Sequence, residues 1–399
     1  MANSNLTQAK RAKNDEFYTQ FIDIQKEIQA YVDYNPDVFR DKIILMPCDD
    51  PEWSNFTRYF AQNFERFGIK KMISTSYASG SKSYTSNYQA TLFETEDPQY
   101  DKSKTKSHGK IYILDHDTTG DGTIDIDDLE WQYLEWDGDF RSKEVTVLRD
   151  EADIIITNPP FSLFRDFLAW IVEWDKQFTV IGNMNAITYK ETFPLIKDDK
   201  MWLGATNFNT WMYFEVPEDF EYASTYKFDR ERNWVKVNRV PGVCRFTNID
   251  HGKRYEHIPL MTMEDNRKFN KQIQKKAISY QKYDNYDAIE VPYTSGIPSD
   301  YQWVMGVPIS FLDKYSPDQF KLVWFTSWRD EFECIPSKKY INPQQHNPNW
   351  SISNWSKANT RATISYNAKP INWVYYTAEN TDWFLSIVYA RILIQHRND

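Results

Sequence analysis

The sequence predicts an α/β protein with a doubly wound sheet, followed by a C-terminal region of different composition. Strand-like apolar runs alternate with helix-like runs over residues 41–77 and again over residues 153–184. Such alternation is typical of strand–helix–strand units, in which the helices pack on the faces of a parallel sheet. After about residue 260 the pattern changes to basic helical sequence and then to sequence rich in Pro, Asn and Trp. We therefore divide the chain into a first domain, 1–260, and a C-terminal region, 261–399.

The first strand–helix–strand unit follows an N-terminal helix. Residues 21–31, FIDIQKEIQAY, carry apolar side chains at near-helical spacing. The run DKIILMP, residues 41–47, predicts the first central strand. The run SNFTRYFAQNFERFG, residues 54–68, predicts a helix that ends at its last residue, a glycine. IKKMISTSY, residues 69–77, then predicts the second strand.

An acidic segment separates the two units. KIYIL, residues 110–114, is strand-like, and DTTGDGTIDIDD, residues 117–128, is rich in turn-forming Gly and Asp. Four carboxylates stand at ligand places of the EF-hand calcium loop, those of Asp117, Asp121, Asp125 and Asp128. However, Thr119 stands where a ligand is needed, and a strand precedes the loop instead of a helix. We expect a hairpin insertion over about residues 100–135 and no metal site, with a calcium loop as the less favoured alternative.

The second unit contains the most distinctive stretch of the chain, DIIITNPPFSLF, residues 153–164. Three consecutive isoleucines predict a buried strand, and the apolar spacing of the residues after the prolines predicts a helix. QFTVIGNM, residues 177–184, predicts the next strand. MWLGAT, TWMYFEVP and WVKVNRVPGVCRFTNI, between residues 201 and 249, predict further strands.

The corner Asn158-Pro159-Pro160-Phe161 lies at the carboxyl end of the predicted strand, the edge at which open α/β sheets bind ligands. The prolines lack N–H groups and disfavour a helix, so we expect the local carbonyls to stay available as acceptors. Asn158 adds a side-chain acceptor and Phe161 an aromatic face. Two acceptors beside a flat apolar wall suit an exocyclic amine on a planar ring. The alternative is a strand-ending turn in which Phe161 belongs to the core.

This corner resembles the catalytic motif of amino-methyltransferases that use S-adenosylmethionine, and the whole chain resembles the EcoRI-type adenine-specific DNA methyltransferase family. Blocks that are similar to the family's, in the family's order, cover most of residues 1–325, whereas the final seventy or so residues match poorly apart from YARILI. The blocks are KNDEFYTQ, PCDDPEWSNFTRYF, DGDFRS, ADIIITNPPFSLF, VIGNMNAITYKE, CRFTNID, NYDAIEVP and MGVPISFLDKYSPDQF.

The resemblance implies a Rossmann-like methyltransferase sheet, S-adenosylmethionine as cofactor, and a set of site residues. The implied catalytic residues are Asn158, Pro159, Pro160 and Phe161. The implied cofactor-binding residues are Phe17, Tyr18, Thr19, Pro47, Cys48, Asp49, Asp50, Asp139, Phe140 and Asn158. A carboxylate of the PCDDP turn would bind the cofactor's ammonium group, and the DGDF turn would hold its adenine. The chain departs from many methyltransferases in lacking the glycine-rich loop after the first strand, and the acidic residue expected after the second strand is absent.

The function implied is N6 methylation of an adenine that is flipped out of double-stranded DNA, in restriction-modification or in protection of phage or host DNA. The C-terminal region would then help to recognise the target. One rival is methylation of a glutamine amide in a protein. Enzymes of that kind carry a similar tetrad but lack a large C-terminal region and usually retain the glycine loop. Another rival is a catalytically inactive nucleic-acid-binding protein with a methyltransferase fold.

Charge and composition limit these interpretations. The chain has a formal net charge of −10, but basic residues interleave with aromatics after residue 234, so a basic groove on an acidic body is expected. The DNA-binding candidates are Lys253, Arg254, Lys275 and Lys276. Three cysteines without ligand or disulfide spacing, and no signal-peptide or membrane-span pattern, predict the cytoplasm of a bacterial or phage-infected cell. A cognate restriction endonuclease is a possible partner.

Overall fold

The computed structural model describes residues 18–49, 54–78, 99–206, 213–215, 226–229, 235–239, 242–276, 278–326, 337–355, 358–370 and 372–397. The chain separates into two compact units. The first consists of Met1–Ala186 and Met201–Gly252, and the second of Ile187–Lys200 and Lys253–Asp399. The second unit therefore includes two short segments, residues 187–200 and 253–260, that the sequence division assigned to the first domain.

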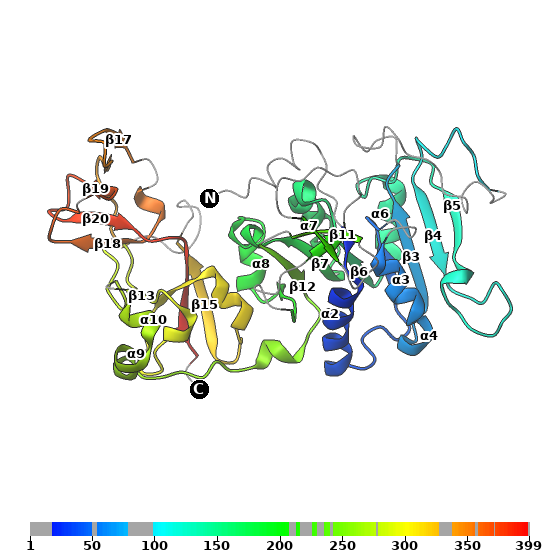
Figure 1. The fold of residues 1–399 in the computed structure, drawn as a ribbon, viewed down its shortest axis with the longest axis horizontal. Helices are drawn as coiled ribbons and strands as arrows, with labels where there is room; N and C mark the ends of the chain where they lie inside the picture. Colours follow the sequence, from blue (N-terminus) through cyan, green and yellow to red (C-terminus); the bar gives the residue numbers. More distant parts are fainter. Residues whose placement is uncertain are drawn as a thin grey trace. The chain divides into compact units, whose positions relative to one another are not determined.

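The first unit is built on an eight-stranded sheet in the order β5-β4-β3-β2-β6-β7-β12-β8 (Figure 1). Its strands are β2 (Ile43–Met46), β3 (Lys71–Ser76), β4 (Lys110–Leu114), β5 (Glu130–Tyr133), β6 (Ile154–Thr157), β7 (Gln177–Asn183), β8 (Trp202–Leu203) and β12 (Val243–Thr247). The four central strands, β3, β2, β6 and β7, are parallel. On one side β4 and β5, and on the other β12 and β8, are antiparallel. The α/β class and the parallel centre are confirmed, but the sheet as a whole is mixed.

Helices pack against this sheet, and all but the one that follows Ser142 lie where the sequence predicted them. They are α2 (Phe21–Tyr34), α3 (Asn55–Gln62), α4 (Phe64–Phe67), α6 (Lys143–Glu151) and α7 (Phe164–Val172). The Ser54 side chain caps α3 by accepting a hydrogen bond from the Phe56 amide, and Gly68 ends α4 with a φ of +64°. Only glycine adopts that conformation without a steric penalty, so the predicted helix end is confirmed.

The core of the first unit lies between one face of the sheet and helices α2, α3 and α4. Alternate residues of a strand point to opposite faces, so Ile154 and Ile156 of β6 join this core while Ile155 points away. The helices contribute Ile24, Ile28, Phe60 and other aromatic and aliphatic side chains. Burial on both faces explains why the strand is an uninterrupted apolar run.

The acidic segment extends the sheet at one edge. β4 pairs with both β3 and β5 in antiparallel register, and a 3-10 turn, η2 (Ile126–Asp128), precedes β5. A further small sheet in the first unit has the order β1-β9-β11-β10, with β1 (Tyr18–Thr19), β9 (Tyr213–Glu215), β10 (Tyr226–Asp229) and β11 (Val235–Arg239).

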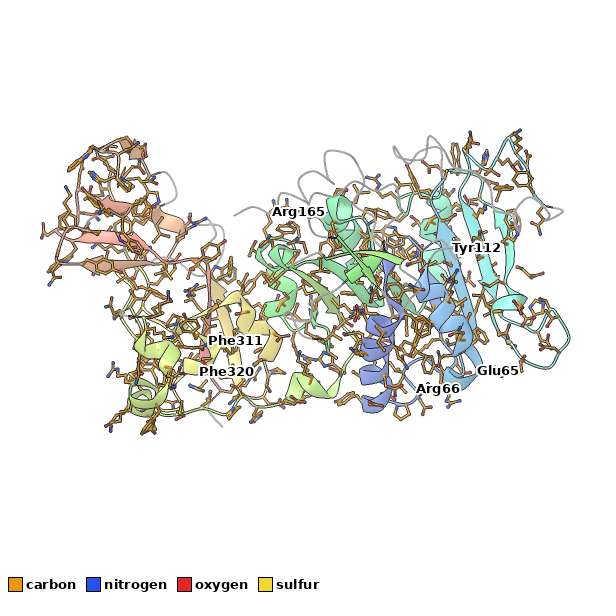
Figure 2. The ribbon with its side chains drawn as sticks, viewed as in Figure 1. Glu65, Arg66, Tyr112, Arg165, Phe311 and Phe320 are labelled. Carbon is orange, nitrogen blue, oxygen red and sulfur yellow. The ribbon has the colours of Figure 1, made fainter. Side chains whose placement is uncertain are left out.

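The second unit contains two sheets and short helices. One sheet has the order β13-β14-β21-β15, with β13 (Ile289–Glu290), β14 (Met305–Pro308), β15 (Phe320–Phe325) and β21 (Arg391–His396). The other has the order β17-β16-β19-β20-β18, with β16 (Gln344–His346), β17 (Ile352–Asn354), β18 (Thr363–Tyr366), β19 (Tyr375–Thr377) and β20 (Phe384–Ile387). The helices are α8 (Phe193–Lys197), α9 (Met263–Phe269) and α10 (Lys271–Gln274). In the interior of this unit the rings of Phe311 and Phe320 pack edge to face, with their centroids 5.3 Å apart (Figure 2).

In the described part of the chain, no helix combines the length and the apolar character needed to cross a membrane.

Candidate active site

The carboxyl ends of β2 and β6 lie side by side because the two strands are parallel and adjacent. Ile44 is in register with Ile154, and Leu45 with Ile155. The turn after β2 and the Asn-Pro-Pro-Phe corner after β6 therefore meet at one edge of the sheet. The sequence predicted this edge as the site, because ligands of open α/β sheets bind outside the carboxyl ends of the strands.

Asp49 connects the two strand ends. One of its carboxylate oxygens, Oδ1, accepts a hydrogen bond from Ser54 Oγ at 2.8 Å, and the other, Oδ2, accepts one from Thr157 Oγ1. All three residues are buried. Ser54 is the cap of α3, so this carboxylate joins the end of β2, the start of α3 and the residue before Asn158. The side-chain bonds of Asp49 thus fix the two strand ends and the start of the helix relative to one another.

Hydroxyl side chains of β3 bind the backbone of the turn that follows β2. Ser74 Oγ donates to the Asp49 carbonyl, and Thr75 Oγ1 donates to the Pro47 carbonyl at 3.0 Å. Thr57 Oγ1 on α3 lies 3.1 Å from Ser74 Oγ. The expected acidic residue at the end of β3 is indeed replaced by small hydroxyl residues, and their role is to hold the backbone of the neighbouring strand end.

The corner itself is partly accessible. Asn158, Pro160 and Phe161 are half-buried, and Pro159 is buried. The Pro160 carbonyl accepts a hydrogen bond from Leu163 N at 2.9 Å, which begins the short 3-10 helix η3 (Phe161–Leu163). The expectation that all local carbonyls stay clear of a helix is therefore wrong for Pro160. No donor among the described residues reaches the Pro159 carbonyl, so that acceptor remains available as expected.

The N-terminal KNDEFYTQ block contacts the start of α3, next to the Asp49 turn, through its backbone. Asn55, at the start of α3, donates from Nδ2 to the Thr19 carbonyl at 2.8 Å. Phe21 packs edge to face on Tyr59 of α3, with ring centroids 5.3 Å apart. This places β1 beside the helix that follows the Asp49 turn. Two predicted site residues, Phe17 and Asp50, lie outside the described residues, and Tyr18 is described by its backbone alone.

The DGDF turn lies at the carboxyl end of β3. Ala78 N donates to the Asp137 carbonyl at 2.7 Å, and a Cβ on Gly138, whose φ is +83°, would come within 2.2 Å of the Ser76 carbonyl. Glycine is required by this close approach. The turn thus brings Asp139 to the carboxyl edge of the parallel strands.

The two predicted residues of this turn have protein partners. Arg141 binds the Asp139 carboxylate through Nε at 2.9 Å and Nη2 at 2.6 Å, and this bond lowers the Asp139 pKa below its ordinary value. Phe140 is buried, and its ring packs on Phe167 and Trp170 of α7. That placement gives Phe140 a packing role in the turn, and its contact with a cofactor ring stays a prediction.

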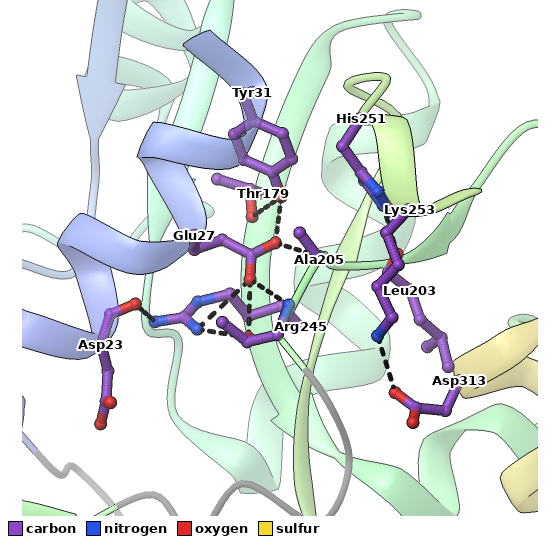
Figure 3. A network of polar contacts seen from close by, with 11 residues as sticks. Asp23, Glu27, Tyr31, Thr179, Leu203, Ala205, Arg245, His251, Lys253 and Asp313 are labelled. Carbon is purple, nitrogen blue, oxygen red and sulfur yellow. Dashed lines mark hydrogen bonds and ion pairs between the residues drawn. The ribbon is translucent and has the colours of Figure 1, made fainter. Parts of the chain in front are cut away.

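A buried ionic network was not foreseen from the sequence (Figure 3). Glu27 of α2 accepts hydrogen bonds from the backbone amides of Ala205 and Thr206 at 2.7 and 2.9 Å and from Tyr31 Oη at 2.6 Å. Arg245 of β12 lies 3.5 Å from the same carboxylate. The side chains of Glu27 and Arg245 are only 1% and 2% exposed. This network attaches α2 to β12 and to the backbone that follows β8.

The predicted DNA-binding residues fall into two groups. Lys253 pairs with Asp313 at 3.1 Å, and the buried Arg254 pairs with Asp199. Lys275 and Lys276, directly after α10, are exposed. Lys275 and Lys276 offer exposed charge to a phosphate, whereas the buried Arg254 guanidinium already binds a carboxylate and is shielded from an external anion.

The aspartates of the EF-hand-like loop bind their own backbone. Asp117 accepts from the amides of Gly120 and Gly122, and Asp128 accepts from those of Thr118, Thr119 and Asp125. These bonds lower the pKa of both carboxyl groups. Calcium needs oxygen ligands that converge on one point, whereas these carboxylates face N–H groups. Among the described residues, no group of three or more His, Cys, Asp and Glu side chains is arranged to hold a metal ion.

Comparisons with known proteins agree on one family. The model of the family described as "Adenine-specific methyltransferase EcoRI" matches residues 5–397. The chain is 40% identical to the type II methyltransferase M.EcoRI of Escherichia coli over 331 residues, which cover 82% of this chain and 91% of the relative. It is 33% identical to the type II methyltransferase M.MpnI of Mycoplasma pneumoniae, over 79% of this chain and 83% of the relative. A third relative, M.MgeORF184P of Mycoplasma genitalium, is also 33% identical, over 79% of this chain and 84% of its own length. No solved structure matches the chain.

Proposed function

The chain belongs to the EcoRI family of adenine-specific methyltransferases, and on that premise we propose that it transfers a methyl group from S-adenosylmethionine to N6 of an adenine in double-stranded DNA. A type II restriction-modification setting follows from the relatives, with protection of phage or host DNA as the physiological result. The proposed location is the cytoplasm of a bacterial or phage-infected cell, beside a cognate endonuclease. The catalytic core is a doubly wound, Rossmann-like methyltransferase sheet.

The observation that carries the proposal is the junction of Asp49, Thr157 and the Asn-Pro-Pro corner. Thr157 is held by the Asp49 carboxylate and is followed directly by Asn158, so the position of Asn158 is determined by bonds to β2 and α3. A reacting group that is held in this way loses little freedom when the substrate binds. The Pro159 carbonyl next to it supplies a second acceptor in a backbone that the prolines restrict.

These two acceptors suit the N6 amine of adenine. An amine in conjugation with a purine ring is a poor nucleophile, because its lone pair is delocalised. Hydrogen bonds from its two N–H groups to Asn158 Oδ1 and the Pro159 carbonyl would direct the remaining lone pair toward the methyl donor. The half-buried ring of Phe161 offers a stacking face for the adenine, which must leave the duplex to reach the sheet edge.

S-adenosylmethionine supplies an activated methyl group on a positively charged sulfur. The residues at this edge suit a positively charged cofactor, because the carboxylates of Asp49 and Asp139 lie at the carboxyl ends of β2 and β3. We propose that the Asp139 carboxylate accepts a hydrogen bond from the cofactor adenine, and that Pro47, Cys48 and the backbone of Tyr18 and Thr19 line the methionine end. Asp49 contributes negative charge there, while its hydrogen bonds give it a positioning role.

The test is Asn158→Ala. The prolines and the Asp49 bonds hold the corner without the amide, so folding and cofactor binding should be nearly unchanged, while methyl transfer should fall by at least about a hundredfold. Transfer is measured with radiolabelled methyl donor on genomic DNA that lacks adenine methylation, and cofactor binding by calorimetry. Asn35→Ala, an exposed site at the end of α2, is the matched control and should be as active as the wild type.

Phe161→Ala separates base capture from transfer. Loss of a stacking ring costs about 1 to 3 kcal/mol per base, so this variant should bind the extruded adenine more weakly as well as reacting more slowly. Fluorescence of 2-aminopurine at the target position reports extrusion. Normal methylation by Asn158→Ala would overturn the assignment of the site, and absence of methylation by the wild type would overturn the function.

A further inference from the structure

The tip of the β16–β17 hairpin presents a tryptophan to solvent. Trp350 is 86% exposed and has a φ of +64°, a conformation that costs free energy for any residue with a Cβ. The turn that carries it is well bonded. Trp350 N donates to the Asn347 carbonyl and Asn347 N to the Ser351 carbonyl, both at 3.0 Å, and Asn347 Nδ2 donates to Ser351 Oγ at 2.9 Å. This well-bonded turn holds a large apolar ring in contact with water.

A lysine and two further flat rings lie next to this indole. The Lys369 ammonium is 5.5 Å from the ring centroid of Trp350 and 5.4 Å from that of Tyr375. Tyr375 of β19 stacks in turn on His346 of β16, with centroids 4.6 Å apart and planes within 2°. Burial and the nearby Lys369 lower the His346 pKa, which favours the neutral imidazole, so the positive charge of the group is that of the Lys369 ammonium. We call Trp350, Lys369, Tyr375 and His346 the hairpin cluster.

The charge around the hairpin cluster contrasts with that of the whole chain. Residues 337–397 contain seven Lys and Arg side chains but only two Asp and Glu, in a protein with a net charge of −10. The same segment exposes further aromatic rings, those of Trp373, Trp383 and Tyr389. A positive segment with exposed rings complements a polyanion that carries flat bases. Protein-binding surfaces, by contrast, are depleted in lysine at their centres.

We propose that the hairpin cluster contacts the DNA substrate, with the Trp350 indole stacked on a nucleobase and the Lys369 ammonium against a phosphate. The proposal rests on the proposed function, which requires the duplex to open at the target adenine and so exposes base faces that a closed duplex hides. The lysine, held between two rings, is positioned to neutralise the backbone beside the stacked base.

The experiment compares wild type with Trp350→Ala, Trp350→Phe, Lys369→Met and the control Trp303→Ala. Trp303 is a second exposed tryptophan of the same unit, 68% exposed and outside the hairpin. Each protein is titrated at several salt concentrations into a fluorescein-labelled duplex, the genomic fragment that the wild type binds most tightly, whether or not the wild type methylates it. Trp350→Ala should raise the Kd roughly 5- to 150-fold, the usual effect of removing a base-stacking ring, and Trp350→Phe should restore most of the affinity.

Lys369→Met should flatten the slope of log Kd against log salt by about one, as expected when one lysine no longer neutralises a phosphate. Melting temperature and cofactor binding should be unchanged in all variants, because the changed side chains lie at the surface of the unit. A Kd within twofold of wild type for Trp350→Ala, or equal losses of affinity for Trp350→Ala and Trp303→Ala, would refute the proposal. If the wild type binds duplex DNA but does not methylate it, the proposed function fails while the same comparison still decides the role of the hairpin. If the wild type binds no DNA, both fail.

Discussion

Removal of the Glu27 carboxylate should destabilise the first unit strongly. In Glu27→Ala the amides of Ala205 and Thr206 lose their acceptor, and the guanidinium of Arg245, only 2% exposed, loses its counter-ion. Breaking one partner of a buried ion pair costs about 3 to 5 kcal/mol, because the remaining charge stays buried and uncompensated. For a unit of this size each kcal/mol lowers the melting temperature by about 2 to 4 °C, so a decrease of roughly 10 °C is expected.

The assay is thermal and urea unfolding followed by circular dichroism, with a double-mutant cycle of Glu27→Ala and Arg245→Met. Since the double variant buries no unpaired charge, its loss of unfolding free energy should be clearly smaller than the sum of the two single losses. Asp37→Ala breaks the exposed pair with Arg40 and serves as the control, with no measurable shift expected. Additive single effects would refute this reasoning, and so would a loss of unfolding free energy in Glu27→Ala below about 1 kcal/mol, the average for single substitutions of all kinds.

The ion pair of Glu27 and Arg245 also predicts that the unfolding free energy of the first unit depends on pH. Burial opposes ionisation of Glu27, but the Arg245 guanidinium and the hydrogen bonds from Thr206 and Tyr31 outweigh it and lower the pKa below the ordinary value of 4.5. A carboxyl group whose pKa is lower in the folded than in the unfolded state stabilises the fold above its unfolded-state pKa. That contribution is lost as the pH falls through the folded-state pKa. The difference in unfolding free energy between wild type and Glu27→Gln should therefore shrink as the pH is lowered below 4.5.

Two further predictions concern the ligands. Asp139→Ala should weaken S-adenosylmethionine binding by about 1 to 3 kcal/mol, the usual contribution of a hydrogen bond to a charged group, as measured by calorimetry; an unchanged affinity would remove Asp139 from the cofactor site. Replacing the exposed Lys275 and Lys276 by Ala should flatten the salt dependence of DNA affinity by about one unit for each phosphate that the two lysines neutralise. If the slope in that variant equals that of the wild type, the positive surface that binds DNA lies elsewhere, with the hairpin cluster as the next place to look.

Much of the local structure was predictable because its causes are local. The isoleucine run before Asn158 forms β6, Gly68 ends α4 in the left-handed conformation, and Ser54 caps α3. Each depends on the residues within one turn or strand: apolar burial on both faces, the absence of a Cβ, and a hydroxyl beside an open amide. The position of the Asn-Pro-Pro-Phe corner at a strand end follows from the same short-range pattern.

The edges of the large sheet could not be predicted in this way. KIYIL was correctly predicted as a strand, but no short segment around it specifies that β4 joins the sheet antiparallel to β3, or that β12 pairs with β7. Strand order depends on which apolar faces cover one another in the folded chain. The mixed character of the sheet therefore became visible only in the tertiary structure.

The site shows the same division between local and long-range information. The sequence by itself determined which residues stand at the ends of the strands, and hence that Asp49 and Asn158 belong to one edge of the sheet. Only the tertiary structure decided what those residues do there: the Asp49 carboxylate binds Ser54 and Thr157, and Arg254, a surface candidate in the sequence, is buried in an ion pair. The physical reason is that a polar side chain in the interior must find its partner, and that partner is chosen by proximity in space, which the order of residues along the chain does not encode in any short segment.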